Sequence, residues 1–251
     1  MKQTILIYCI IINVLSSYDQ QYRTIDIFYT FENKINIRNF DVTLKSNQFG
    51  SLCIIKDNIS MGTVNFGPNG EIILSDELPE NYDDLVNTYF YKDYSTNFLF
   101  AEEEFGDKKI LIKEKMDLFD WLLTNDSEEI LGYKCTKAVC KFRGRCYEAW
   151  FTTDLPFKAA PWKFHGLPGV ILKVETDDKR IKFLAQSVDI KNDSKIEYSL
   201  KDRIIMSYKD FCIAFKKNTK QMNEKLKAFS AQNNLSYTGL SQDYSRLEII
   251  D

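Results

Sequence analysis

The chain has 251 residues, of which 44% are hydrophobic and 14% aromatic, a composition that argues against a disordered protein. Its 33 basic and 36 acidic residues give a net charge of −3, which argues against a nucleic-acid-binding protein. The length allows one large all-β domain or two smaller ones. Because proline and glycine are scarce, with 5 and 10 residues, no long flexible linker is expected and residues 18–251 are interpreted as one β-rich domain.

The N-terminus has the order of a secretory signal peptide. Lys2 supplies the positive charge, Thr4–Leu15 is apolar, and Ser16 and Ser17 offer small residues for cleavage. The apolar run of about 12 residues is shorter than the roughly 20 that span a bilayer. Residues 1–17 are therefore predicted to be a signal peptide. The alternative is a buried first strand or helix of the domain.

Short segments of alternating or apolar character follow at nearly regular spacing, separated by turn residues such as those at 67–70. This pattern is typical of an antiparallel sheet, a sandwich or a half-open barrel. The segments expected to be strands in this part are Tyr22–Glu32, Phe40–Leu44, Leu52–Lys56, Glu71–Leu74, Thr88–Tyr94, Phe98–Glu104 and Lys108–Lys113.

The stretch from Ile130 to Glu175 is the richest in aromatic residues and in turn-forming residues. It predicts a hairpin whose strands meet at Arg143-Gly144, then a loop with three prolines, and then a β-branched strand from Val170. This strand pairs in the prediction with Lys179–Ile190, across a turn at Asp177-Asp178.

The segment Ser207–Asn233 changes to helical spacing. An apolar stripe runs along one face, Ser207 and Asp210 resemble a capping pair, and lysines cover the opposite face. We expect this amphipathic helix to pack on the sheet with its lysine face in solvent. The alternative is a membrane or partner surface. The stripe is formed by Tyr208, Phe211, Phe215, Met222, Leu226 and Phe229.

Three runs of the sequence, ILGYKCTKA, FRGR-x-YEAWFT and PWKFHGLPGVILKV, carry a resemblance to a known family. Together with Trp121 shortly before them, they resemble the GLPGLI family of bacterial envelope proteins, with Val170 in place of the usual leucine. The resemblance is specific between Trp121 and Ile190. It implies an exported protein, in the periplasm, associated with the outer membrane or secreted, and it implies no particular reaction.

Six cysteines are present, and Cys9 lies in the predicted signal peptide. An exported chain can form disulfides. If the hairpin turns through a three-residue loop that ends at Gly144, Cys140 faces Cys146, and a Cys140–Cys146 disulfide is predicted. A two-residue loop would oppose Cys140 with Tyr147 instead. A bridge from Cys135 to Cys53, or free thiols throughout, would be consistent with the same sequence.

No catalytic residue, metal site or cofactor is predicted. The motifs of serine hydrolases and zinc proteases are missing, the cysteine spacing is not that of a zinc site, and His165 is the single histidine. The loop that contains His165 is the candidate binding site, where it would line an apolar pocket; the alternative is that it plugs the core. Pro168-Gly169 suits a type II turn with Gly169 at positive φ. The candidate residues are Trp162, Phe164, His165, Gly166, Leu167, Pro168 and Gly169.

The predicted function is therefore a non-enzymatic exported module that binds an apolar small ligand or an envelope protein. No nucleic-acid partner and no transmembrane segment in the mature chain are expected. The alternative is an exported hydrolase or thiol-dependent enzyme. A cavity without converging polar groups would favour the binding module, whereas a cleft with a reactive thiolate or a carboxylate pair would favour the enzyme.

Overall fold

A computed structural model describes residues 23–35, 37–57, 63–66, 72–75, 87–105, 108–192 and 196–232. The predicted signal peptide, the turn at 67–70 and the residues after 232 lie outside the described residues. Within the described part, no helix combines the length and the apolar character that crossing a membrane requires.

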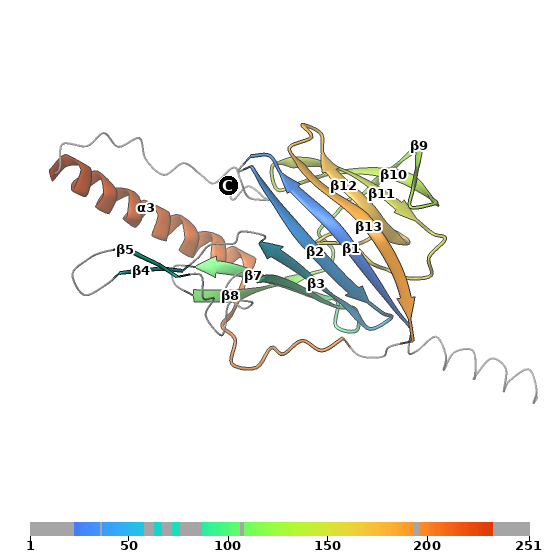
Figure 1. Ribbon diagram of the computed structural model, residues 1–251, viewed down its shortest axis with the longest axis horizontal. Helices are drawn as coiled ribbons and strands as arrows, with labels where there is room; N and C mark the ends of the chain where they lie inside the picture. Colours follow the sequence, from blue (N-terminus) through green and yellow to red (C-terminus); the bar gives the residue numbers. More distant parts are fainter. Residues whose placement is uncertain are drawn as a thin grey trace, which may run out of the picture.

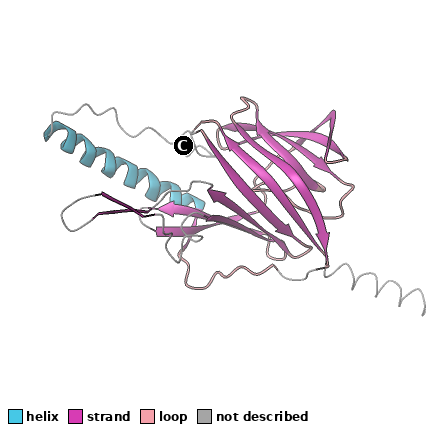
Figure 2. Ribbon diagram, in the orientation of Figure 1, coloured by secondary structure: helices cyan, strands magenta, loops and turns pink. Residues whose placement is uncertain are grey.

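One open sheet of twelve strands forms the body of the protein, with a single described helix after it (Figures 1 and 2). All neighbouring strands are antiparallel except β14 and β8, which are parallel. In spatial order the strands are β14 (Ile205–Ser207), β8 (Lys108–Lys115), β7 (Phe98–Phe105), β6 (Asn87–Asp93), β3 (Gly50–Asp57), β2 (Arg38–Ser46), β1 (Thr24–Asn33), β13 (Ile181–Lys191), β12 (Val170–Thr176), β11 (Arg145–Thr152), β10 (Tyr133–Phe142) and β9 (Leu122–Ile130). A separate hairpin pairs β4 (Thr63–Phe66) with β5 (Ile72–Ser75).

The alternation predicted for the first strand is confirmed. In the sheet, β1 is a central strand. Ile25, Ile27, Tyr29 and Phe31 are buried on one face. On its two sides β1 pairs with β2 and with β13, which is far away in the sequence. The stacked rings of Phe31 and Phe183, 4.3 Å apart, join these strands in the core. The mainly β fold class with an antiparallel sheet is therefore confirmed.

The sheet curls around the loop that follows β11. The backbone N–H of Trp162 donates to Cys53 Sγ on β3, and the ring of Phe164 lies 5.2 Å from that of Tyr147 on β11. Because β3 and β11 are five strands apart in the sheet, one loop can touch both only if the sheet is strongly bent. Register shifts at Phe28/Tyr29 and at Trp150/Phe151 are irregularities of the kind that bend a strand.

The hairpin between β10 and β11 corrects the register predicted for the cysteines. Phe142 pairs with Arg145, so the loop contains the two residues Arg143 and Gly144, with φ of 42° and 77°. These values are typical of a type I′ turn. Cys140 faces Tyr147 on the buried side, whereas Cys146 is exposed and pairs with Lys141. A shift of one residue thus puts the two thiols on opposite faces, and both are free.

The helix α3 (Tyr208–Gln232) begins where the sequence predicts. Ser207 caps it, since its Oγ accepts the N–H of Asp210 at 3.1 Å. Phe211 is fully buried beside Phe105 of β7, but Phe229 is 58% exposed and Leu226 is half-buried. The expectation that Phe229 docks on the sheet is wrong. Since α3 follows β14, the last strand at the sheet edge, its later turns extend away from the sheet (Figure 2).

Candidate functional site

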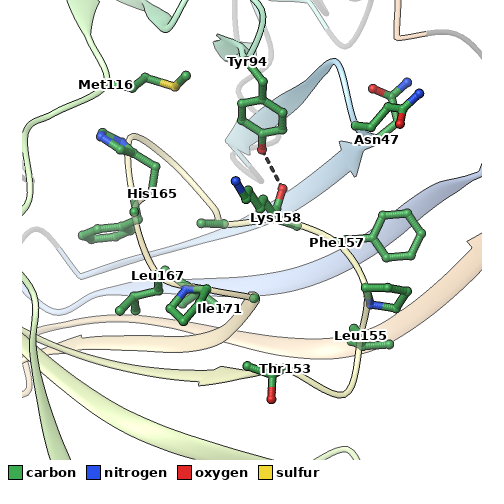
Figure 3. A pocket seen from close by; sticks show the side chains of 18 of the residues that line it. Asn47, Tyr94, Met116, Thr153, Leu155, Phe157, Lys158, His165, Leu167 and Ile171 are labelled. Atoms are coloured by element: carbon green, nitrogen blue, oxygen red, sulfur yellow. Dashed lines mark hydrogen bonds between the residues drawn. The ribbon is translucent and has the colours of Figure 1, made fainter. Parts of the chain in front are cut away.

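A cleft of about 930 Å³ opens between the loop of residues 153–169 and the turns at the ends of β2 and β6 (Figure 3). We call its buried apolar lining the floor and its polar lining the rim. The floor contains Leu155, Ala159, Ala160, Phe164, Leu167 and Ile171. The rim contains Arg23, Asn47, Gln48, Asn97, Lys158 and His165. Phe157 and Tyr94, both half-buried, add aromatic surface between them.

The loop backbone at residues 158–160 forms one side of the cleft, which we call the wall. Hydrogen bonds from the sheet hold this wall in place. The carbonyl of Lys158 accepts from Tyr94 Oη at 2.6 Å and from Ser46 Oγ at 2.9 Å. The carbonyl of Ala160 accepts from Lys92 Nζ at 2.7 Å. Since these donors come from β2, from β6 and from the residue that follows β6, the wall is fixed by the sheet and the cleft is preformed.

Pro168 lies in a tight turn that differs from the one predicted. The N–H of Gly169 donates to the carbonyl of Leu167 at 2.9 Å, which closes a three-residue turn around Pro168. Positive φ occurs in this loop at Trp162, at 50°, and at Gly166, at 95°, but not at Gly169. Gly169 is required for another reason: a Cβ there would lie 2.1 Å from the carbonyl oxygen of Thr152. The predicted type II turn is therefore wrong.

The candidate residues of the loop form two groups, one buried in the core and one lining the cleft. Trp162 is buried away from the cleft, where its ring lies 6.1 Å from Phe142. Phe164 is fully buried, meets Trp162 edge to face with ring centroids 4.8 Å apart, and still forms part of the floor. The remaining candidates, His165, Gly166, Leu167, Pro168 and Gly169, all line the cleft. The alternative that the loop fills the core is confirmed for the two aromatic rings.

His165 is held as a neutral imidazole with both ring nitrogens engaged. Its Nδ1 lies 2.8 Å from the carbonyl of Lys163, and its Nε2 accepts the N–H of Leu118 at 3.5 Å, contacts that assign the proton to Nδ1. Burial lowers the pKa of His165. Its own carbonyl accepts from Trp121 Nε1 at 2.8 Å. With both ring nitrogens facing backbone groups, His165 has no free nitrogen to act as a general base.

The buried thiols are not activated as nucleophiles, because their pKa values are raised. Burial raises the pKa of Cys53 and of Cys135 to about 11, and that of Cys140 to about 12. A thiol enzyme needs a lowered pKa, because the thiolate is the nucleophile. Cys146 and Cys212 do not line the cleft. Among the described residues, no cluster of histidine, cysteine and carboxylate side chains could hold a metal ion.

Lys92 lies directly behind the cleft wall. It is 1% exposed, and burial lowers its pKa to about 8. In the part of the chain that the structure describes, no carboxylate pairs with it. Sequence reasoning did not single out Lys92, although its alternation with Phe90 in β6 places both on the buried face.

A second buried lysine, Lys163, has the counter-charges that Lys92 lacks. Its Nζ lies 3.5 Å from Glu114 and 3.9 Å from Glu103. Arg143 pairs with the same Glu114, and its guanidinium stacks 3.3 Å from the ring of Tyr208. This network ties the far side of the loop to the hairpin tip and to the first turn of α3.

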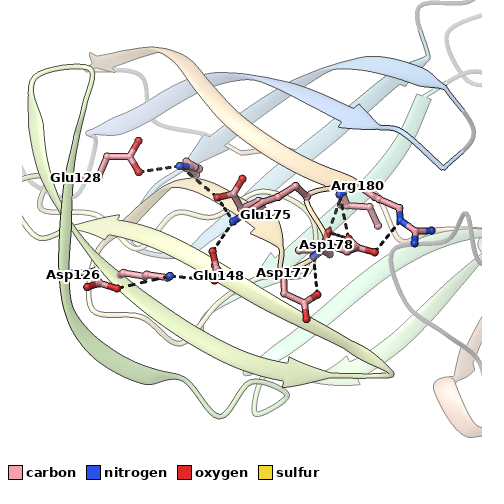
Figure 4. Close-up of polar contacts among 12 residues, drawn as sticks. Asp126, Glu128, Glu148, Glu175, Asp177, Asp178 and Arg180 are labelled. Atoms are coloured by element: carbon pink, nitrogen blue, oxygen red, sulfur yellow. Dashed lines mark hydrogen bonds and ion pairs between the residues drawn. The ribbon is translucent and has the colours of Figure 1, made fainter.

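The outer face of β9–β12 carries a ladder of alternating charges (Figure 4). Lys179 pairs with Glu148 and Glu175 at 2.8 Å, and Lys173 pairs with Glu128 at 2.9 Å while covering the ring of Trp150. Because carboxylates and lysines alternate across neighbouring strands, their charges largely cancel. We interpret this surface as a solvated face of the sheet.

Comparisons with known proteins relate this architecture to N-glycanases. Residues 96–211 match the family model described as the N-glycanase peptide, N-terminal domain. The solved structure of PNGF-II in space group C2 covers 78% of this chain with 16% identity and a TM-score of 0.53, and the one in P21 covers 78% with 15% identity and a TM-score of 0.52. No curated protein matches the chain.

At such identities the likeness shows a shared fold. The chain spans only about a third of PNGF-II, since the matches cover 33% and 34% of that protein. The family match includes the cleft loop but not Arg23, Asn47 or Lys92, so the cleft lies partly outside it. These comparisons do not test the GLPGLI resemblance, which stays a prediction.

Proposed function

We propose that this chain is a non-catalytic ligand-binding module, with the cleft beside residues 153–169 as its ligand site. The observation that carries the proposal is the preformed wall, which five polar groups of the sheet and loop hold in place around a cleft with an apolar floor. Among the described lining residues there is no carboxylate, and the imidazole is neutral and engaged. Such a lining can bind a ligand but offers no acid and base pair.

A glycan is the ligand class that best suits this lining. A sugar ring presents an apolar C–H face and a set of hydroxyl groups, which correspond to the floor with Phe157 and to the amides of Asn97 and Gln48 on the rim. The matching family is named for an N-glycanase, which also supports a glycan. Where the sequence led us to expect an apolar ligand or an envelope partner, we therefore propose a ligand with both apolar and polar faces.

Titration calorimetry of the purified chain with a free biantennary N-glycan tests the proposal. Phe157→Ala, which removes the half-buried ring at the cleft, should weaken binding by about tenfold, or roughly 1.4 kcal/mol. Ile213→Ala is the matched control, because Ile213 is an exposed apolar residue on α3. No binding at millimolar glycan would contradict the proposal. Release of the glycan from a glycopeptide substrate would contradict the non-catalytic role.

We further propose that the module is exported as a relative of the GLPGLI proteins. The motif runs that carry this resemblance lie mainly in β10, β11, the cleft loop and β12, and the N-terminal segment has the order of a signal peptide. Intact-mass measurement of protein recovered from the cell envelope should show a chain that lacks about residues 1–17. Retention of Met1 on most of the envelope protein would contradict export by this signal.

A further inference from the structure

The fixed charges that line the cleft are positive. Arg23 and Lys158 belong to the rim, and the described lining residues include no aspartate or glutamate. The nearby carboxylate of Asp93 is turned into its own turn, where its Oδ1 accepts the N–H groups of Ser95 and Thr96 at 2.9 Å and 3.2 Å. A cleft bordered by one sign of charge attracts ligands of the opposite sign.

A third cation lies behind the wall. Lys92 Nζ is 2.7 Å from the carbonyl of Ala160, and Ala160 itself lines the cleft. One carbonyl oxygen does not neutralise an ammonium group that is 1% exposed. Burying a charge without a counter-ion is costly, which is why buried lysines are usually paired, as Lys163 is here with Glu114.

The other ionisable groups around Lys92 are uncharged at neutral pH. Burial raises the pKa of Cys53 to about 11 and also raises the pKa values of Tyr29 and Tyr94. The pKa of His165 is lowered by burial and, in smaller part, by the charge of Lys92 itself. Asp117 acts on His165 from an exposed position, where solvent screens it. The positive charge of Lys92 is therefore not cancelled from any side.

We propose that the cleft selects glycans that carry an acidic group, a carboxylate or a sulfate, and that Arg23, Lys158 and Lys92 together provide this selectivity. The inference rests on the proposed function of the cleft as a glycan site. The two rim cations can pair directly with the anion, whereas Lys92 acts through the wall as a buried positive charge that an anion in the cleft would offset.

Calorimetry with three matched glycans tests the selectivity. The probes are a biantennary N-glycan with terminal sialic acids, the same glycan after removal of the sialic acids, and the latter with sulfate on its terminal galactoses. We expect at least about tenfold tighter binding of an acidic form than of the neutral form, or roughly 1.4 kcal/mol. The two acidic probes distinguish carboxylate from sulfate. Raising the salt concentration should weaken acidic but not neutral binding.

Charge-removing variants locate the source of the selectivity. Arg23→Gln and Lys158→Gln should each lower the acidic-to-neutral affinity ratio several-fold, because each removes a cation that pairs with the acidic group. Lys92→Met should lower the ratio as well, although its side chain does not line the cleft. Lys141→Gln is the matched control, because Lys141 is an exposed lysine on β10 outside the cleft.

The pH dependence of the wild-type chain gives a readout that needs no variant. Between pH 7 and pH 9.5 Lys92 loses its proton, so the ratio should fall several-fold and Lys92→Met should remove this fall. Equal affinities for acidic and neutral glycans would overturn the inference and leave the proposed function standing. Failure of all three glycans to bind would overturn both.

Discussion

The loop of residues 153–169 and the helix α3 both carry apolar aromatic side chains, but these side chains differ in burial. Those of the loop are mostly buried, whereas Phe229 on the helix is exposed. The loop passes between the two halves of the curled sheet, where its aromatic rings are enclosed by strands on both sides. The helix leaves from an edge strand, so only its first turns have the sheet beside them. An apolar pattern identifies one face of a segment, whereas burial of that face depends on whether another element packs against it.

The two segments should differ most in the stability that is lost when a phenylalanine ring is removed. Phe164→Ala should lower the free energy of unfolding by about 3–5 kcal/mol, because it leaves a cavity among packed aromatic rings. Phe229→Ala, on the exposed part of α3, should cost less than about 1 kcal/mol. Urea denaturation of both variants measures the difference. Similar losses would show that the helix stripe is as deeply covered as the loop.

A methyl group added to the loop should have the next largest effect. Gly169→Ala places its Cβ against the backbone of Thr152 and should cost about 2–3 kcal/mol, since backbone must move. Gly132→Ala is the matched control: Gly132 has φ of 80° with open space around its Cβ position, so only the conformational cost of about 1 kcal/mol applies. Equal melting temperatures of the two variants would contradict the close approach at Gly169.

Replacing the unpaired lysine should stabilise the protein at neutral pH. Because burial lowers the pKa of Lys92 from 10.5 to about 8, the folded state binds fewer protons than the unfolded state between these values, and stability rises with pH across this window. Lys92→Met removes the cost of the buried charge and should be about 1–2 kcal/mol more stable at pH 7. This advantage should shrink as pH rises from about 8 to 10.5.

Denaturation of the wild type and Lys92→Met at several pH values measures this shrinkage. The titrations of Cys53 and the neighbouring tyrosines are present in both proteins, so they largely cancel in the difference. A constant stability difference across the window would contradict a buried, unpaired ammonium group.

The smallest effect is expected at the start of α3. Ser207→Ala removes the cap that accepts the N–H of Asp210 and should cost about 1 kcal/mol or less. The loss should appear mainly as faster hydrogen exchange in the first turn, which Phe211 anchors to the sheet. Unchanged exchange in that turn would show that packing alone fixes the beginning of the helix.

The hairpin between β10 and β11 shows where local sequence reasoning stops. A three-residue loop needs positive φ only at Gly144, which suits a sequence without Asn-Gly or Asp-Gly at the turn. The observed loop requires positive φ at Arg143 as well, which is unfavourable for an arginine. The ion pair of Arg143 with Glu114 and its stacking on Tyr208 can offset that cost. Both partners are distant in the sequence, so the register could not be read from the hairpin alone.

The local elements of this protein could be predicted from its sequence. Alternation with a period of two placed strands such as β1 and β6, and the capping pair at Ser207 placed the beginning of α3. The sequence also identified the loop whose residues from Phe164 to Gly169 line the cleft. These features follow from energies that act within a turn or a strand, and such energies depend on neighbouring residues of the chain.

Which of these elements meet depends on contacts between distant parts of the chain. The pairing of β1 with β13, the curl of the sheet and the enclosure of Lys92 behind Ala160 all join residues more than 60 positions apart. The cleft is built from such contacts, since Arg23, Asn47 and Lys158 come from separate parts of the chain. No periodic pattern records them, because burial and charge environment are properties of the surrounding fold rather than of a residue's sequence neighbours.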